Sequence, residues 1–440
     1  MIVMRHLWRI AIQWTLNLIY LVFLIVGMPW MVWRVIRGKN RTGWGQKLWG
    51  LAPATSNPNL EQVNCLWFHA VSVGEVNLLE PIIDRLLEQQ PKLRIAISTT
   101  TATGFELARK KYASHEVFFC PFDFSWAIKR VLRRLKPAAL VLAELELWPN
   151  LISVCSSAQV PVLIVNGRLG SKSFRGYQRF GWFTRPLLRQ LTGVAAQDTT
   201  IAQRFKALGC HQDRVVVTGS VKFDGVDPEA QAERTQELAA LAGITARDTV
   251  LIAGSTQLEE DLMVAEVFLR LRDEYPRLKV ILAPRHPDRC VSLGNQLAEL
   301  GIESTFRSQL PSDANPRFLI VDVIGELGAW WGRADVAYVG GSMGKREGQN
   351  MIEPAAYAVP LCFGPRTRNF RDVVDQLLAE DAAVVVRDAA SLESFVVGSM
   401  SKRVWAKNMG QRARQVVLRN QGAAAHTAQW LTAVVGGQNS

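Results

Sequence analysis

Apolar and polar positions alternate in regular blocks from residue 65 towards the C-terminus. Short apolar runs of strand length, CLWFHAVSV (65–73) and RIAISTTT (94–101), flank a segment with helical spacing, VNLLEPIIDRLLEQQP (76–91). Further strand-like runs, each followed by a polar or helical stretch, lie at 116–123, 138–146, 160–167, 192–198 and 214–224. Strands that alternate with helices at this interval favour a parallel sheet covered by helices on both faces.

A second alternating series follows a polar, helix-prone connection. It begins with TVLIAGS near residue 250 and continues through LKVILAPRHP (278–287) and RFLIVDVIGEL (317–327). We therefore predict an α/β protein with two Rossmann-like doubly wound domains that face a cleft. The expected parts are an N-terminal membrane anchor with a basic flank at 1–45, a first domain at 46–226, a linker at 227–249 and a second domain at 250–440.

The anchor is predicted from residues 14–36, which are almost wholly apolar until Arg34. A stretch of ~20 residues crosses a hydrocarbon core of ~30 Å. The denser group of cations follows this segment, so the positive-inside rule places the large domain in the cytoplasm. A cleaved signal peptide is the competing interpretation, but no small-residue cleavage site follows the apolar run. Because Asn17, Gly27 and Pro29 interrupt it, a shallow anchor that does not span the membrane remains an alternative.

The chain carries a formal net charge of +12, which suits an anionic membrane surface, a phosphorylated substrate or nucleic acid. Its cations are spread through the helices without an aromatic-interleaved stripe, which argues against nucleic acid. The six cysteines form no C-x-x-C pair and most lie in apolar runs, so we expect free thiols in a reducing compartment. The six histidines are equally dispersed, and no metal site is expected.

A glycine-rich stretch, GGSMGKREGQNMIEP (340–354), follows the strand-like run ADVAYV. A strand, a glycine turn and a helix start can present backbone N–H groups and a helix dipole to a phosphate. Asn350 and Glu353 would share one face of the first helical turn and could hold the hydroxyls of a sugar. The alternative is that the glycines serve the backbone turn alone.

Two acidic positions stand out in the first series. Glu75 lies where the strand of FHAVSVGE turns towards a helix, and could take a proton from a substrate hydroxyl or simply interact with the helix dipole. Glu144 and Glu146 end an apolar strand, and alternation along that strand would turn both to one face. Lys222 is a possible partner, and structural support of the strand end is the alternative role for the pair.

The second series offers candidate contacts for a nucleotide. Arg285 in PRHP follows an apolar strand, and its planar fork can donate two parallel hydrogen bonds to a phosphate. Gly325 and Glu326 in VIGEL lie at a helix start after a strand, where backbone groups could read the edge of a base. GST at 254–256 is a further small-residue turn after a strand.

Taken together, these motifs resemble those of the Kdo transferases, the 3-deoxy-D-manno-octulosonic acid transferases of lipopolysaccharide synthesis, which have a GT-B glycosyltransferase fold. The matching segments, in the family's order from about residue 67 to 372, are HAVSVGE, STTTATG, ELELWPN, NGRLGSKS, GSVKFD, GST, PRHP, GELG, VGGS, N-x-x-EPAA and FGP-x-x-x-NF-x-D.

The resemblance implies an inverting, metal-independent transfer of Kdo from CMP-Kdo to lipid A precursor, without a cofactor. It also implies a place on the cytoplasmic face of the bacterial inner membrane. The family's catalytic base falls on Glu75, and its transition-state-stabilising acid and lysine fall on Glu144 and Lys222. Its CMP contacts fall on Pro284, Arg285, Ile324, Gly325, Glu326, Asn350, Met351, Ile352 and Glu353.

The chain departs from the family pattern at Gln257 and within the run 347–351. Gln257 stands where the family more often has His, and Glu347 and Gln349 replace parts of a Gly-Gly-His-Asn-Pro run. Glutamine keeps a hydrogen-bonding group but cannot carry a charge. The alternatives to a Kdo transferase are another GT-B enzyme, such as a UDP-sugar transferase or epimerase, and a membrane-tethered scaffold without turnover.

Overall fold

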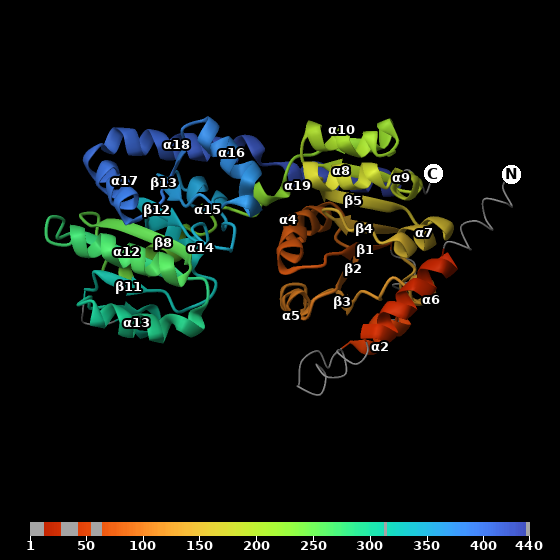
Figure 1. Cartoon of the computed structure of the whole chain (residues 1–440), viewed down its shortest axis with the longest axis horizontal. Coiled ribbons are helices and arrows are strands. Elements are labelled where there is room, and N and C mark those ends of the chain that lie inside the picture. Colours follow the sequence, from red (N-terminus) through yellow and green to blue (C-terminus); the bar gives the residue numbers. More distant parts are fainter. Residues whose placement is uncertain (1–12, 28–42, 54–63, 312–314, 437–440) are drawn as a thin grey trace. The chain divides into compact units, whose positions relative to one another are not determined.

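The computed structural model describes residues 13–27, 43–53, 64–311 and 315–436. The chain divides into two compact units (Figure 1). Unit 1 comprises Met1–Gly225 and Gln421–Ser440, and unit 2 comprises Val226–Asn420.

Unit 1 is built on a parallel sheet that has seven strands among the described residues, in the order β3-β2-β1-β4-β5-β6-β7. The strands are β1 (Cys65–His69), β2 (Arg94–Thr99), β3 (Glu116–Phe119), β4 (Ala139–Ala143), β5 (Val162–Gly167), β6 (Gly193–Ala196) and β7 (Val215–Val217). The helices are a helical stretch at 13–27, α2 (Trp44–Trp49), α4 (Val73–Gln89), α5 (Ala102–Lys111), α6 (Ser125–Leu135), α7 (Pro149–Ser157), α8 (Ser171–Arg179), α9 (Gly181–Leu188), α10 (Thr199–Ala207) and α19 (Ala423–Gly436), with single 3₁₀ turns η1 (Gln212–Arg214) and η2 (Val221–Phe223).

Unit 2 repeats this plan, with a parallel sheet of seven described strands in the order β10-β11-β9-β8-β12-β13-β14. The strands are β8 (Thr249–Thr256), β9 (Leu278–Pro284), β10 (Thr305–Phe306), β11 (Phe318–Ile320), β12 (Val336–Val339), β13 (Leu361–Phe363) and β14 (Ala383–Val385). The helices are α11 (Ala232–Leu241), α12 (Leu258–Leu271), α13 (Cys290–Glu299), α14 (Leu327–Trp330), α15 (Ile352–Ala356), α16 (Arg371–Ala379), α17 (Ala389–Ser401) and α18 (Arg403–Asn420), with 3₁₀ turns η3 (Pro287–Arg289), η4 (Arg307–Gln309), η5 (Trp331–Arg333) and η6 (Arg368–Phe370).

The two faces of the unit 1 sheet are both covered, which explains its continuous apolar runs. Trp67 and Leu140 pack into one core with residues of α6, α7, α9 and α10. Their neighbours Phe68 and Val141 point to the opposite face and pack with α4, α5 and α19. A parallel strand is apolar at successive positions when helices lie on both sides of the sheet. The predicted fold class of two doubly wound Rossmann-like sheets is confirmed.

The second domain was expected to extend over 250–440, but residues 421–436 belong to unit 1. The α19 helix packs with α4 in the core of that unit. The predicted linker at 227–249 instead lies in unit 2, where α11 contacts α14. Asp224 holds the start of α19 where the chain returns to unit 1. Its Oδ1 accepts a hydrogen bond from the Gly422 N–H at 2.6 Å, and its Oδ2 accepts one from the Ala424 N–H at 2.9 Å.

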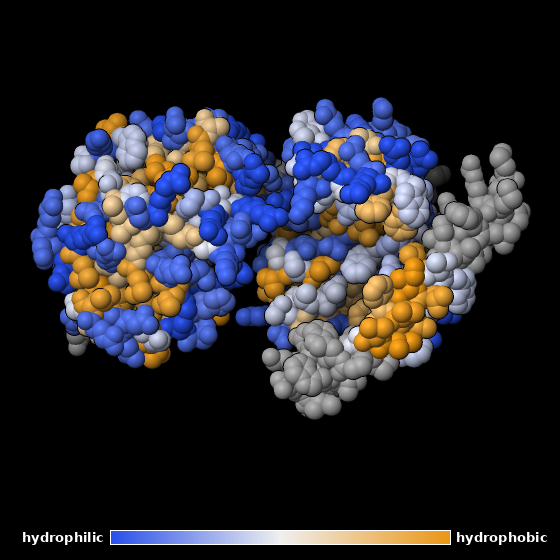
Figure 2. All heavy atoms as spheres, in the orientation of Figure 1, coloured by the Kyte–Doolittle hydropathy of each residue, from blue (hydrophilic) through white to orange (hydrophobic). Residues whose placement is uncertain are grey.

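The apolar N-terminal segment is described only over residues 13–27, which are helical. Its large apolar side chains face outward, with exposed fractions of 66% for Trp14, 62% for Leu18 and 71% for Phe23. Figure 2 shows the apolar surface that this helix presents on unit 1. Within the described ranges, no helix is long and apolar enough to cross a membrane. The rest of the predicted anchor, 28–36, lies outside the described residues.

The six cysteines are all buried and free, as the sequence predicts.

Candidate functional site

The carboxyl ends of β1 and β4 meet at the point where the strand order of unit 1 reverses. The two strands are neighbours in the sheet, and the chain leaves them in opposite directions along it, towards β2 and β5. Ligands of open α/β sheets bind at such a switch point. Glu75 follows β1 and Glu144 follows β4. The topology therefore brings two of the sequence-predicted residues to one place.

Glu75 lies in the first turn of α4, three residues after the N-cap Ser72. Its Oε2 accepts a hydrogen bond from the Val71 N–H at 2.9 Å, and its Oε1 accepts one from the Ser72 hydroxyl at 2.9 Å. Burial raises the pKa of the Glu75 carboxyl, and the negative charge of Glu144 raises this pKa further, against the opposing effect of the local hydrogen bonds. A carboxylate with a raised pKa is a stronger proton acceptor than one in water.

The acidic segment that follows β4 does not continue the strand. Glu144 has a φ of +56°, so the chain turns out of the sheet immediately after Ala143. The expectation that Glu144 and Glu146 face one way by strand alternation is therefore wrong, because both residues lie beyond the end of the strand. Glu146 Oε2 accepts a hydrogen bond from the Trp148 indole at 2.9 Å. Burial and the charge of Glu75 raise the pKa of Glu146 to about 7.

Lys222 lies in η2 and is half-buried. This single turn packs against α4, the helix that carries Glu75. It is held by Asn166 at the end of β5, whose Oδ1 accepts a hydrogen bond from the Val221 N–H at 3.1 Å. The sequence reasoning did not single out Asn166. Its signal is the Asn-Gly step at a strand end, since Asn166 has a φ of +50°, a conformation that asparagine adopts more readily than most residues.

In unit 2, Pro284 ends β9 and is buried, and Arg285 follows it as an exposed residue. The Arg285 N–H donates to the Thr256 carbonyl at 3.0 Å, which joins the ends of β9 and β8. No hydrogen bond or ion pair links the Arg285 guanidinium to another described side chain. Arg285 is thus available at a strand end for an anionic ligand.

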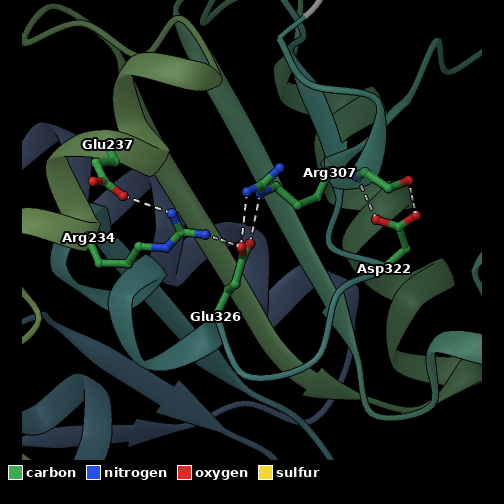
Figure 3. Close-up of polar contacts among 6 residues, drawn as sticks. Arg234, Glu237, Arg307, Asp322 and Glu326 are labelled. Carbon is green, nitrogen blue, oxygen red and sulfur yellow. Dashed lines mark hydrogen bonds and ion pairs between the residues drawn. The ribbon is translucent and has the colours of Figure 1, made fainter.

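The 322–326 turn is held by charged side chains (Figure 3). Glu326 accepts two hydrogen bonds from Arg307, at 2.8 and 3.0 Å, and one from Arg234 at 2.5 Å. Asp322 accepts hydrogen bonds from the N–H and hydroxyl of Ser308 at 2.9 and 2.5 Å. The Glu326 carboxylate is therefore a structural acceptor, which leaves the backbone of the turn as the part that can contact a ligand.

The tip of this turn projects from the surface. Ile324 is 84% exposed, and Gly325 has a φ of +94°, which favours glycine. The sequence predicted that the backbone here meets the base of a nucleotide, and this stays a prediction.

The glycine turn at 340–343 differs from its predicted role. The N–H groups of Gly341, Ser342 and Met343 donate to the Glu260 carboxylate at 2.6, 2.8 and 3.0 Å. The Tyr338 hydroxyl donates to the same carboxylate at 2.9 Å. A buried carboxylate thus occupies the N–H groups that were expected to bind a phosphate. Asn350 was expected in the first turn of the helix that follows, but α15 begins only at Ile352, so Asn350 precedes the helix.

Asn350 and Glu353 contact each other in this structure. Asn350 Nδ2 donates to Glu353 Oε1 at 3.0 Å, and the Trp331 indole donates to Glu353 Oε2 at 3.0 Å. Burial raises the pKa of the Glu353 carboxyl. Met351 and Ile352 are fully buried, so their side chains belong to the core of unit 2. Of these four residues, the polar pair retains an accessible surface for a sugar.

Glu260 is the residue that sequence reasoning missed in unit 2. It is buried at the third position of α12, and it accepts a hydrogen bond from the N–H of Gln257, the N-cap, at 2.8 Å. The Gln-x-x-Glu spacing is a helix-start signal. The same carboxylate also holds the turn at 341–343, about eighty residues later in the chain, and no sequence pattern near Glu260 indicates this contact. Among the described residues, no cluster of histidine, cysteine or acidic side chains could hold a metal ion.

Comparison with solved structures defines the class first. The chain superposes on the UDP-GlcNAc 2-epimerase from Neisseria meningitidis bound to UDP-GlcNAc with a TM-score of 0.58, at 11% identity, over 85% of this chain and all of that one. The two-sheet architecture is therefore that of the GT-B class.

Comparison of sequences then gives the family. A family model described as 3-deoxy-D-manno-octulosonic-acid transferase (Kdo transferase) matches residues 39–225. The 3-deoxy-D-manno-octulosonic acid transferase of Bordetella pertussis is 33% identical over 82% of this chain and 85% of its own length. That of Haemophilus influenzae is 30% identical over 81% and 84%. The chain belongs to the Kdo transferase family, and it is a glycosyltransferase.

Proposed function

We propose that this protein transfers Kdo from CMP-Kdo to a hydroxyl of lipid A precursor during lipopolysaccharide synthesis. The observation that carries the proposal is the position of Glu75. This residue combines a raised pKa with a place at the unit 1 switch point, in a chain about one third identical to a Kdo transferase over most of its length.

In the proposed reaction, unit 2 holds the donor. Arg285, whose guanidinium has no partner among the described side chains, supplies a cation at the end of β9 for the phosphate of CMP. The exposed turn at Ile324 and Gly325 offers its backbone to the base. Asn350 and Glu353, fixed to each other at 3.0 Å, present polar atoms for hydroxyl groups of the sugar or ribose.

In the same proposal, unit 1 performs the proton transfer. Glu75 accepts the proton of the acceptor hydroxyl as that oxygen bonds to the anomeric carbon of Kdo. The bond from that carbon to the phosphate oxygen breaks, and CMP leaves with the electron pair. Arg285 stabilises the charge on the departing phosphate, and Glu144 and Lys222 support the transition state. One direct displacement inverts the anomeric centre. The proposal requires no metal ion or cofactor.

Mass spectrometry of the product from CMP-Kdo and a tetra-acylated lipid A precursor tests the function. The expected product is the precursor with added Kdo. A parallel reaction should contain UDP-GlcNAc in place of CMP-Kdo and be followed by NMR, because the fold is shared with a UDP-sugar epimerase and an epimer has the same mass as its substrate. Conversion of the UDP-sugar with no product from CMP-Kdo would refute the proposal.

The proposed location is the cytoplasmic face of the inner membrane, where lipid A precursor is the acceptor. Support comes from the outward apolar side chains of the 13–27 helix and the net charge of +12, which together suit an anionic membrane surface. Flotation with vesicles that contain or lack anionic lipid measures this attachment. Binding to neither kind of vesicle would refute it.

A further inference from the structure

The helix at 13–27 turns Gln13 and Asn17 towards the protein. Asn17 is 3% exposed and Gln13 is 8% exposed, whereas Leu18, the next residue after Asn17, is 62% exposed. A surface helix of a globular protein normally has the reverse arrangement, with apolar residues inward. The inward face of this helix contacts the rest of unit 1 through hydrogen bonds.

These hydrogen bonds are made by Asn17 and Tyr20. Asn17 Oδ1 accepts from the Ser125 N–H at 3.1 Å and from Asn150 Nδ2 at 3.0 Å, and Asn17 Nδ2 donates to the Ser125 hydroxyl at 2.8 Å. The Tyr20 hydroxyl donates to Asp123 Oδ2 at 3.1 Å. Buried polar contacts of this kind fix one geometry, because each group left without a partner costs free energy.

The same partners hold the start of α7. Asp123 accepts hydrogen bonds from the N–H groups of Asn150 and Leu151, at 2.9 and 2.8 Å, in the first turn of that helix. The Asn150 side chain also donates to the Asp123 carbonyl at 2.6 Å. Asn150 is fully buried and Asp123 is 6% exposed. The N-terminal helix and the start of α7 thus share one buried polar cluster.

The acidic segment lies directly before this cluster along the chain. Glu144, Glu146 and Trp148 occupy the short connection between the end of β4 and the start of α7. Only Pro149 separates Trp148, which donates to Glu146, from Asn150. Fixing Asn150 therefore fixes the downstream end of the segment, and β4 fixes the other end.

We infer that Asn17 and Tyr20 are positioning residues for the transfer reaction, because they hold the start of α7 and through it the 144–148 segment. This inference rests on the proposed function. It assigns the N-terminal helix a role in turnover that is separate from membrane attachment. The expected consequence is that loss of the Asn17 contacts lowers kcat even when the acceptor is presented in detergent micelles.

The test compares Asn17→Leu with Leu18→Asn in the full-length chain. The two variants exchange the same residue types at adjacent positions, one inward and one outward. In micelles, Asn17→Leu is expected to lower kcat about tenfold with an unchanged KM for CMP-Kdo, whereas Leu18→Asn, on the proposed membrane-facing side, is expected to raise the KM for the acceptor without the tenfold loss of kcat. Equal kcat values for the two variants would overturn the inference.

Tyr20→Phe provides a milder variant in case Asn17→Leu fails to fold. It removes one hydroxyl and keeps the ring beside Phe124. A fall in kcat of about threefold is expected. Amide hydrogen exchange over 144–152 provides a readout that does not depend on Kdo transfer, and exchange should quicken in Tyr20→Phe and not in Leu18→Asn. Unchanged exchange in Tyr20→Phe would overturn the inference, whereas a wild-type chain without Kdo transfer would refute the proposed function instead.

Discussion

The carboxylates at the strand ends of the two units differ in their partners. In unit 1, Glu75 and Glu146 accept hydrogen bonds from neutral groups, namely a peptide N–H, a hydroxyl and an indole, and burial raises the pKa of both. In unit 2, Glu326 is paired with two arginines, and Glu260 accepts hydrogen bonds from three successive N–H groups of one turn.

This difference separates two uses of the same residue type. An acid with raised pKa and neutral partners can change its protonation state within a reaction. An acid held by arginines or by several N–H groups instead fixes the backbone around it. Glu75 and Glu146 of unit 1 thus have the features expected for proton transfer, whereas Glu326 and Glu260 of unit 2 hold preformed backbone turns. Glu353, also in unit 2, resembles the unit 1 pair, because its partners are neutral and its pKa is raised. Four substitutions test this comparison.

The largest effect is expected for Glu75→Gln. Loss of a general base lowers kcat by about 10²–10⁴-fold, whereas CMP binding, measured by titration calorimetry, should not change. Glu80→Gln is the matched control on the same helix, because Glu80 is half-exposed and pairs with Lys111. A kcat for Glu75→Gln close to that of Glu80→Gln would show that Glu75 is not the general base.

The second effect concerns the stability of unit 2. Glu260→Gln leaves fewer acceptor sites for the N–H groups at 341–343, and an unsatisfied buried donor costs about 1–3 kcal/mol. We expect a lower midpoint of thermal unfolding and weaker CMP binding. Glu259→Gln, one position earlier and exposed, is the control. If both variants unfold at the same temperature, the Glu260 carboxylate does not hold the turn.

The third effect is on donor binding. Arg307→Met removes two hydrogen bonds to Glu326 and frees the exposed turn, so KM for CMP-Kdo should rise about tenfold with little change in kcat. Arg234→Met should have a smaller effect, because the Arg234 side chain is 42% exposed and the Arg307 side chain 13%. A fall in kcat without a change in KM would contradict the binding role.

The smallest effect is on pH dependence. Glu75 must be ionised to accept a proton, so kcat/KM is lost as pH falls through its raised pKa. The Glu144 charge contributes to this raised pKa. Glu144→Gln should therefore move the acidic limb of the pH profile to lower pH, in addition to any loss of rate, whereas Glu144→Asp should keep it near the wild-type position. A shift to higher pH would mean that the limb does not report Glu75.

Much of the fold could be predicted from the sequence, because both sheets are parallel and covered on both faces. Apolar runs such as those of β1 and β4 then alternate with helical segments at regular intervals. The positions of Glu75 and Arg285 at strand ends followed from the same pattern. The role of the glycine turn could not be predicted, because its partner Glu260 lies far away in sequence and fills the site locally favoured for a phosphate.

Asn17 shows a second limit of sequence reasoning. In an apolar run, one asparagine was interpreted as a break in a membrane anchor. Its buried contacts with Ser125 and Asn150 involve residues more than a hundred positions away, so no local pattern could reveal them. Periodicity predicts which face of a helix is apolar, but it does not say whether that face turns inward.

The contacts of Asp224 have a consequence for the connectivity of the chain. Because Asp224 binds Gly422 and Ala424, the segment 226–420 begins and ends beside the same carboxylate. Unit 2 therefore has the topology of an inserted domain, and unit 1 is a discontinuous domain whose last helix is made after unit 2. During synthesis, the core around α4 remains incomplete until α19 emerges from the ribosome. All residues of unit 2 precede α19 in the chain, so unit 2 is synthesised before the core of unit 1 can be completed.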